Sequence, residues 1–194
     1  MSAHSLPAAP PARPRTLLIA TALGGVAVTM LFAGLFGVYL TERSQTLAGG
    51  GEWFPSGSIS LAPGGMMMVT MLLSVISLQW AHYATERDDR THSLLALGLT
   101  ILLGAAVVNQ MVFVWISFAE PVDASAAALL FYVITGAFVA LLVVAIAFLL
   151  LVTVRDLAGS YGHGRADGVA AAALFWYVTV AVYAAVWFAI FVTK

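Results

Sequence analysis

Charged residues are missing from most of this sequence. Only 9% of its 194 residues are charged, whereas a soluble domain usually has about 25%. Asp, Glu, Lys and Arg are absent from five long stretches, which lie between Arg15 and Glu42 and at 53–85, 91–119, 124–154 and 168–193. Each stretch holds an apolar block of the roughly 20 residues that cross a bilayer as a helix. The spans therefore offer no charged group for proton relay, ion coupling or catalysis.

Cysteine is absent altogether, which excludes disulfides, thiolate metal sites and iron–sulfur clusters. Only one of the four histidines, His82, lies near a predicted span. A haem held within a membrane bundle needs two facing histidines, and this chain cannot supply that pair. We expect neither a cofactor nor a metal ion in this chain. The net charge of −1 gives no reason to expect nucleic acid as a partner.

The apolar blocks predict an all-α fold, an integral membrane bundle of five transmembrane helices. They lack strict alternation and exceed the length of a barrel strand, and helices satisfy their own backbone in lipid. Residues 1–15, with four prolines, are expected to form a disordered cytoplasmic tail before a transmembrane domain at 16–194. The helices are predicted at about 16–40, 63–84, 93–118, 124–154 and 168–192. The connection from Glu42 to Ala62 is predicted to be an irregular loop, in which Trp53 anchors the chain at the membrane interface.

The basic residues set the predicted orientation. Six of the eight fall on the side of the N-terminus, namely Arg13, Arg15, Arg87, Arg90, Arg155 and Arg165. Only Arg43 and Lys194 fall on the other side. Because cytoplasmic loops carry the excess of Lys and Arg, we expect a cytoplasmic N-terminus and a C-terminus outside.

Polar residues within the spans have two interpretations. Asn109 and Gln110 lie along the third predicted helix and Gln79 lies in the second. Such amides usually hydrogen-bond a neighbouring helix, while a substrate site is the less common alternative. Serine and threonine in the spans can bond their own helix backbone and need no special role.

Small residues recur at four-residue spacing in the first predicted helix, at Thr21 and Gly25 and again at Ala33 and Gly37. Such pairs let two helix backbones approach closely. They either pack the five helices of this chain or form a docking face for another membrane protein. Both interpretations remain open.

Several motifs together resemble the five-helix subunit III proteins of haem–copper oxidases. The first helix has Phe32-Ala33-Gly34-Leu35-Phe36, and a loop with Trp53 and Pro55 follows. Further along the chain the family's order is matched by Gln79, Gln110, Phe131-Tyr132, Thr135-Gly136 and Trp176. The resemblance covers about Thr16 to Val192.

The sequence departs from that family at every buried ionisable position. The family's glutamate of the first helix falls on Val28, and its other acidic, tyrosine or histidine positions fall on Phe113, Val114, Phe138, Leu141, Tyr177 and Val180. Packing residues remain where polar ones have been lost, which leaves a scaffold role.

The resemblance implies a non-catalytic accessory subunit of a respiratory haem–copper oxidase in the bacterial cytoplasmic membrane. It implies contacts with subunits I and II, which hold the haem and copper, and with membrane phospholipids. The chain would stabilise subunit I and shield its proton and oxygen access. The expected packing or partner contacts are Phe32, Gly34, Phe36, Gly37, Gln79, Gln110, Thr135, Gly136 and Trp176. The alternatives are a subunit III-like companion of a nitric oxide reductase, and a carrier or channel for a small neutral solute using Asn109 and Gln110.

Overall fold

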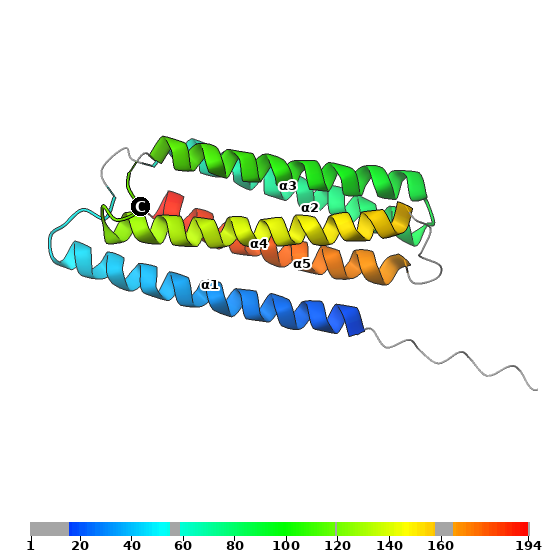
Figure 1. Ribbon diagram of the computed structural model, residues 1–194, viewed down its shortest axis with the longest axis horizontal. Coiled ribbons are helices and arrows are strands. Elements are labelled where there is room, and N and C mark those ends of the chain that lie inside the picture. The colour runs from blue at the N-terminus through cyan, green and yellow to red at the C-terminus, as the bar shows by residue number, and fades with distance from the viewer. Residues whose placement is uncertain (1–15, 55–58, 119, 158–164, 194) are drawn as a thin grey trace, which may run out of the picture.

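The computed structural model describes residues 16–54, 59–118, 120–157 and 165–193, and in these ranges the chain is built from helices, with no strand (Figure 1). Five helices are long and apolar enough to cross a membrane. The elements in chain order are α1 (Thr16–Ala48), α2 (Leu61–Glu86), α3 (Arg90–Phe118), α4 (Ala126–Leu157), α5 (Arg165–Val186) and the π-helix η1 (Trp187–Val192). The predicted fold, an all-α bundle of five membrane-spanning helices, is confirmed.

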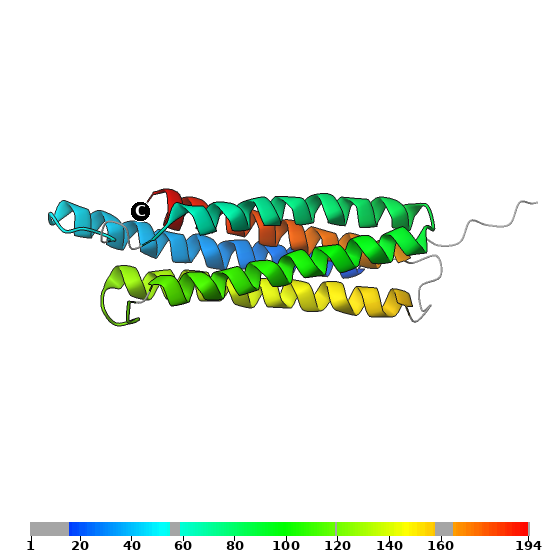
Figure 2. The same ribbon diagram turned by 90° about the horizontal axis from the view of Figure 1, so that it is seen from above.

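Helix α5 occupies the centre of the bundle. It contacts α1, α2 and α4, and α3 completes the bundle by packing on α2 and α4. Helix α1 lies outside these four and packs mainly along α5, with a smaller contact to α4 (Figures 1 and 2). Accordingly, 56% of the most apolar window of the last span is buried, against 17% for α1. Most of the α1 surface therefore faces outward.

Helix α1 continues to Ala48, eight residues beyond its predicted end. The sequence prediction ended the helix where charge returns, but charge ends only the membrane-embedded part. Helical structure stops at the glycine run, where Gly50 has a φ of 76°. The Gly51 N–H donates to the Thr46 carbonyl at 3.0 Å, a pattern that closes a helix at a residue in the left-handed region.

The connection after α1 differs from the predicted interfacial anchor. Trp53 is buried, at 5% exposure, and its ring meets that of Tyr39 edge-on, with the centroids 5.4 Å apart. The Phe54 ring also contacts that of Trp53 and links it to Phe118 at the end of α3. Trp53 therefore fastens the loop to the bundle instead of resting at the lipid surface. Pro55 lies outside the described residues.

Helix α3 begins at Arg90, three residues before the predicted start, because Asp89 caps it. The Asp89 carboxylate accepts the backbone N–H of His92 at 3.2 Å and contacts the His92 ring nitrogen at 2.7 Å. The hydrogen bond from the His92 backbone is the main cause that lowers the pKa of Asp89 below its ordinary 3.8. This cap defines the turn between α2 and α3, where Asp88 has a φ of 57°.

The last span ends in a π-helix, which the sequence prediction did not include. In a π-helix the carbonyls pair five residues ahead, as when the Thr193 N–H donates to the Phe188 carbonyl at 3.0 Å. The Ala189 carbonyl accepts hydrogen bonds from the Thr193 hydroxyl at 2.8 Å and from the Tyr39 hydroxyl of α1 at 3.0 Å. The irregular end of the span is thus tied to α1.

Candidate functional site

Trp176 of α5 lies in the interior of the bundle. Its side chain is fully buried, and its indole N–H donates to the hydroxyl oxygen of Ser74 on α2 at 2.9 Å. Ser74 in turn donates to the Met71 carbonyl at 2.6 Å. A buried indole needs such a partner, because an unpaired N–H in an apolar interior is costly. Trp176, predicted as a packing residue, therefore joins two helices by shape and by a hydrogen bond.

Gly104 of α3 makes room for the Trp176 ring. A β-carbon at this position would lie 2.6 Å from Trp176 Cη2 and 3.2 Å from the Ile146 side chain of α4. These separations are below van der Waals contact, so only glycine fits without displacing the ring. Together with Ser74, this close approach places one side chain of α5 against both α2 and α3.

Thr135 of α4 is a second interhelical link. Its buried hydroxyl donates to the Phe131 carbonyl at 2.6 Å and accepts the indole N–H of Trp115 on α3 at 2.9 Å. The neighbouring Gly136 is half-buried, and no atom lies within 4 Å of the place where its β-carbon would be. Of the predicted Thr135–Gly136 pair, the threonine makes the contact between helices.

The three amides occupy different surroundings. Gln79 of α2 is exposed and lines a groove together with Tyr177 of α5. Gln110 is half-buried and Asn109 is exposed on the outer side of α3. Within the described ranges, neither of these two amides hydrogen-bonds a neighbouring helix. Asn109 therefore lines no path through the bundle, which weakens the carrier alternative.

The predicted residues of α1 divide between an inner and an outer face. Phe32 is buried and Phe36 is half-buried, with their ring centroids 6.2 Å apart. Both line a groove of about 250 Å³ between α1 and α5. Gly34 and Gly37 are exposed, and nothing within the described chain lies within 4 Å of their β-carbon positions.

Gly25 is the glycine of α1 that packs inside the bundle. A β-carbon on Gly25 would lie 3.1 Å from Val178 Cγ2 of α5. The small residues of α1 thus divide: Gly25 accommodates α5 within this chain, while Gly34 and Gly37 are open on the outer face, where a docking role stays a prediction. We refer to Gly34 and Gly37 as the glycine notch.

Most positions at which the family has ionisable residues belong to the apolar core, but Phe113 is exposed on α3. Val114, Phe138, Leu141 and Val180 are buried, and Val28 and Tyr177 are partly buried and pack against this core. The Phe138 ring lies 4.9 Å from that of Tyr183, measured between centroids. The interior at these positions is filled by side chains without charge.

The histidines of the α2–α3 end lie apart from the core. His82 faces Glu86 one helical turn later, at 3.7 Å between Nδ1 and Oε1, and His92 faces Asp89. In the described ranges, no three His, Asp or Glu side chains gather to hold a metal ion. His4 and His163 lie outside those ranges.

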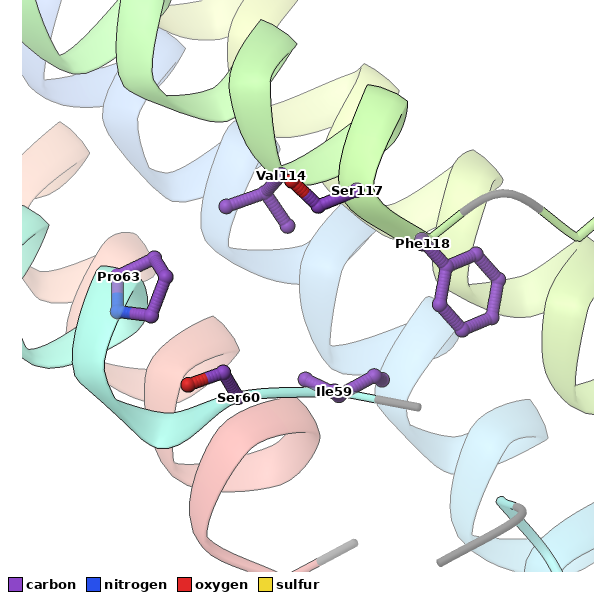
Figure 3. Close-up of a pocket in the computed structure, with 6 residues that line it drawn as sticks. All are labelled: Ile59, Ser60, Pro63, Val114, Ser117 and Phe118. Carbon is purple, nitrogen blue, oxygen red and sulfur yellow. The ribbon is translucent and has the colours of Figure 1, made fainter. Parts of the chain in front are cut away.

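A small cavity lies at the opposite end of the bundle, between the start of α2 and the end of α3 (Figure 3). Its volume is about 30 Å³, which is room for about one water molecule. Its lining is mostly apolar and consists of Ile59, Ser60, Pro63, Val114, Ser117 and Phe118. It is too small to hold an organic substrate.

Sequence reasoning missed two interhelical roles of serine. Ser74 accepts the Trp176 indole, and Ser77 donates to the Ala96 carbonyl of α3 at 2.9 Å. The expectation that these residues bond their own helix is wrong for Ser77 and incomplete for Ser74. Their spacing of three residues puts both hydroxyls on one side of α2, and this spacing is the sequence signal that could have found them.

The sequence matches a known family over almost its whole length. The model of the family described as "Cytochrome c oxidase subunit III" matches residues 15–193. Among curated relatives, cytochrome c oxidase subunit 3 of Pongo abelii is 28% identical over 150 residues, which cover 75% of this chain and 58% of the relative. The protein named probable cytochrome c oxidase subunit 3 of Mycobacterium leprae (strain TN) is 28% identical over 127 residues, covering 64% and 61% of the two chains. This chain thus spans about three-fifths of the length of these relatives.

Proposed function

Because this chain belongs to the cytochrome c oxidase subunit III family, we propose that it is a non-catalytic accessory subunit of a respiratory haem–copper oxidase. It packs beside the catalytic subunit I, with subunit II in the same complex, and phospholipids fill its remaining surface. Electron transfer, oxygen reduction and proton pumping take place on the haem and copper of the partner subunits.

The apolar interior is the observation that carries the non-catalytic role. The core positions Val28, Phe138, Leu141 and Val180 offer no proton donor or acceptor where the family has ionisable residues. A proton path through the bundle would need a chain of titratable groups or ordered water. The physical work left to this chain is to hold partner helices in place and to shield the proton and oxygen access of subunit I.

The glycine notch on α1 is the proposed contact with subunit I. Gly34 and Gly37 are exposed in the middle of an apolar helix, and small residues on such a face allow another helix to approach closely. Helix α1 also has the smallest buried share of the five spans. The outward face of α1 is apolar, and its backbone is uncovered at Gly34 and Gly37. Both features support the docking of another transmembrane helix there.

Affinity purification tests the role in the complex. The chain, tagged after Lys194 and extracted in mild detergent, should bring down larger proteins that carry haem and copper. Mass spectrometry of the purified material identifies them. Recovery of a homo-oligomer free of haem proteins would contradict the proposal and favour the neutral-solute carrier. Recovery of a nitric oxide reductase would favour that alternative, since the chemistry belongs to the partner.

Substitution of the notch tests the docking face. Gly34→Leu should reduce co-purification of subunit I, because the bulky side chain separates the helices. Gly65→Leu on α2 is the matched control, since its β-carbon position is also open. If Gly34→Leu keeps the complex intact in mild detergent, the docking face lies elsewhere although the family role stands.

The proposed location is the bacterial cytoplasmic membrane, with the N-terminus in the cytoplasm and the C-terminus outside. The excess of Lys and Arg on the N-terminal side supports this orientation. Alkaline phosphatase fused after Lys194 should be active, and the same enzyme fused within Arg87–Arg90 should be inactive. The reverse pattern would contradict the orientation.

A further inference from the structure

The outer face of α3 carries a regular stripe that no other described helix covers. Its members are all exposed and follow one another at alternating spacings of four and three residues: Leu95, Leu99, Leu102, Ala106, Asn109, Phe113 and Ile116. This is the heptad spacing with which two helices pack side by side in a left-handed pair. We call these seven residues the α3 stripe.

Asn109 gives the α3 stripe a hydrogen-bonding group at membrane depth. It lies nine residues before the end of α3 at Phe118, which places it about 13 Å inside that end of the helix. In the described ranges its amide makes no hydrogen bond to another residue. A primary amide left unpaired in hydrocarbon is costly, and such groups usually bond a neighbouring helix.

The neighbour that suits this amide best is a second Asn109. An amide side chain holds both donors and an acceptor, so two of them can pair with each other. Two copies inserted in the same orientation are related by a two-fold axis along the membrane normal. That axis makes their α3 helices parallel and places each residue of the stripe opposite itself. Asn109 then meets Asn109 of the second copy, as a single asparagine does in a parallel coiled coil.

The surroundings of Asn109 permit this close approach. Ala105 and Ala106 are small and exposed beside it, so the two backbones can come together where the amides pair. A hollow of about 440 Å³ adjoins the stripe at Leu99, between α3 and α2. Its lining is mostly apolar and includes Ile76 and Trp80 beside Ser77, and it can receive side chains of the second copy.

The α3 stripe lies away from the proposed docking face on α1. Helices α1 and α3 are at opposite edges of the bundle in Figure 1, with α4 and α5 between them. One copy can therefore bind an oxidase through the glycine notch and a second copy through the stripe. We propose that the α3 stripe is a dimer interface between two copies of this chain, with the Asn109 side chains hydrogen-bonded across the two-fold axis.

Single-cysteine cross-linking tests the dimer in native membranes, because the natural chain contains no cysteine. Ala106→Cys should form a disulfide-linked dimer on mild oxidation, since the two α-carbons then lie within reach of a disulfide. Val144→Cys on α4 and Leu72→Cys on α2 are matched controls, since both positions are exposed near the middle of a span. They should remain monomeric on the same gel.

A second change tests the role of the amide. Asn109→Leu in the Ala106→Cys background should lower the cross-linked fraction about fivefold, the effect expected of one interhelical hydrogen bond of about 1 kcal/mol. Asn109→Gln should retain more of it, since that amide can still pair. Equal cross-linking at all three cysteine positions would overturn the proposal, and so would no effect of Asn109→Leu. Cross-linking of the Ala106→Cys variant to a haem-carrying protein would also overturn it, and would show instead that α3 is the oxidase contact.

Discussion

The indole of Trp176 on α5 is hydrogen-bonded to Ser74 on α2, a residue 102 positions earlier in the chain, at 2.9 Å. This bond joins the second span to the fifth in the interior of the bundle. Neither side chain is accessible from outside. The pair therefore reports on whether the last span has docked among the earlier ones.

The Trp176–Ser74 bond should be measurable by a double-mutant cycle. Trp176→Phe and Ser74→Ala should each lower the free energy of unfolding, with a coupling of about 0.6–1.7 kcal/mol, the range for hydrogen bonds between transmembrane helices. Trp176→Phe should cost more by itself, because it also leaves a cavity. Unfolding in mixed micelles supplies the values, and strict additivity would mean that the bond contributes nothing.

Gly104 should not tolerate even alanine. The added methyl group would lie 2.6 Å from the Trp176 ring, so Gly104→Ala should destabilise the bundle by about 1–3 kcal/mol. The matched control is Gly98→Ala on the same helix, where the β-carbon position is open. That change should be neutral or slightly stabilising, because alanine favours helix over glycine by about 1 kcal/mol. Thermal denaturation compares the two variants.

Arg90 connects the start of α3 to the end of α4. Its Nη2 donates to the carbonyls of Asp156 and Leu157 at 2.9 and 2.7 Å, where a helix end leaves carbonyls unpaired. Arg90→Gln should lower stability by about 1 kcal/mol, a value reduced by the partial exposure of the contact. Arg155→Gln, an exposed arginine of the same helix end, should change it little. Equal losses in both variants would argue against the link.

A glutamate at Val28 should impair assembly. Val28 packs against the apolar core, and an acidic residue at mid-span costs about 2.5–3.5 kcal/mol on insertion scales. We expect Val28→Glu to lower the yield of complex without raising the number of protons pumped per electron. Reconstituted vesicles allow both to be compared with the natural protein. Improved pumping at normal yield would show that a polar path survives in this chain.

The cap of α3 should give a small dependence of stability on pH. The pKa of Asp89 is held below 3.8 by the hydrogen bonds from His92. The stabilisation is therefore present above about pH 3.8 and is lost as the pH falls through the lower pKa of the folded state. Asp89→Asn should remove this acid-side loss, which a comparison of thermal midpoints from about pH 5 down to about pH 2 would detect. If the stability of the Asp89→Asn variant falls at acid pH as much as that of the natural protein, the role of Asp89 is contradicted.

The spans could be predicted from sequence because, once barrel strands are excluded by length and lack of alternation, only an α-helix satisfies the backbone in hydrocarbon. A charge-free block of about 25 residues must be a helix, and all five such blocks are helices. Their ends could not be located in the same way. Charge marks where α1 leaves the membrane near Glu42, whereas backbone freedom at Gly50 decides where the helix stops.

The pairing of helices was beyond the sequence signals used. Every face of these helices is apolar, so hydrophobicity does not distinguish the side that meets protein from the side that meets lipid. Trp176 could be recognised as a landmark by resemblance, but its contacts with Ser74 and Gly104 depend on how α2, α3 and α5 are rotated. The same holds for the glycines of α1, where Gly25 faces inward and Gly34 outward.

The pairing of α1 with α5 must wait until α5 has been synthesised. Of the five spans described, α1 leaves the ribosome before the others, and its main neighbour is the last of the five to be made. At about 5–20 residues per second, the interval between them is on the order of ten seconds. During that time the face of α1 that carries Gly25 lacks Val178 of α5, which covers it in the finished bundle. That face is therefore open to lipid or to another helix until α5 is inserted, whereas the glycine notch is open both before and after.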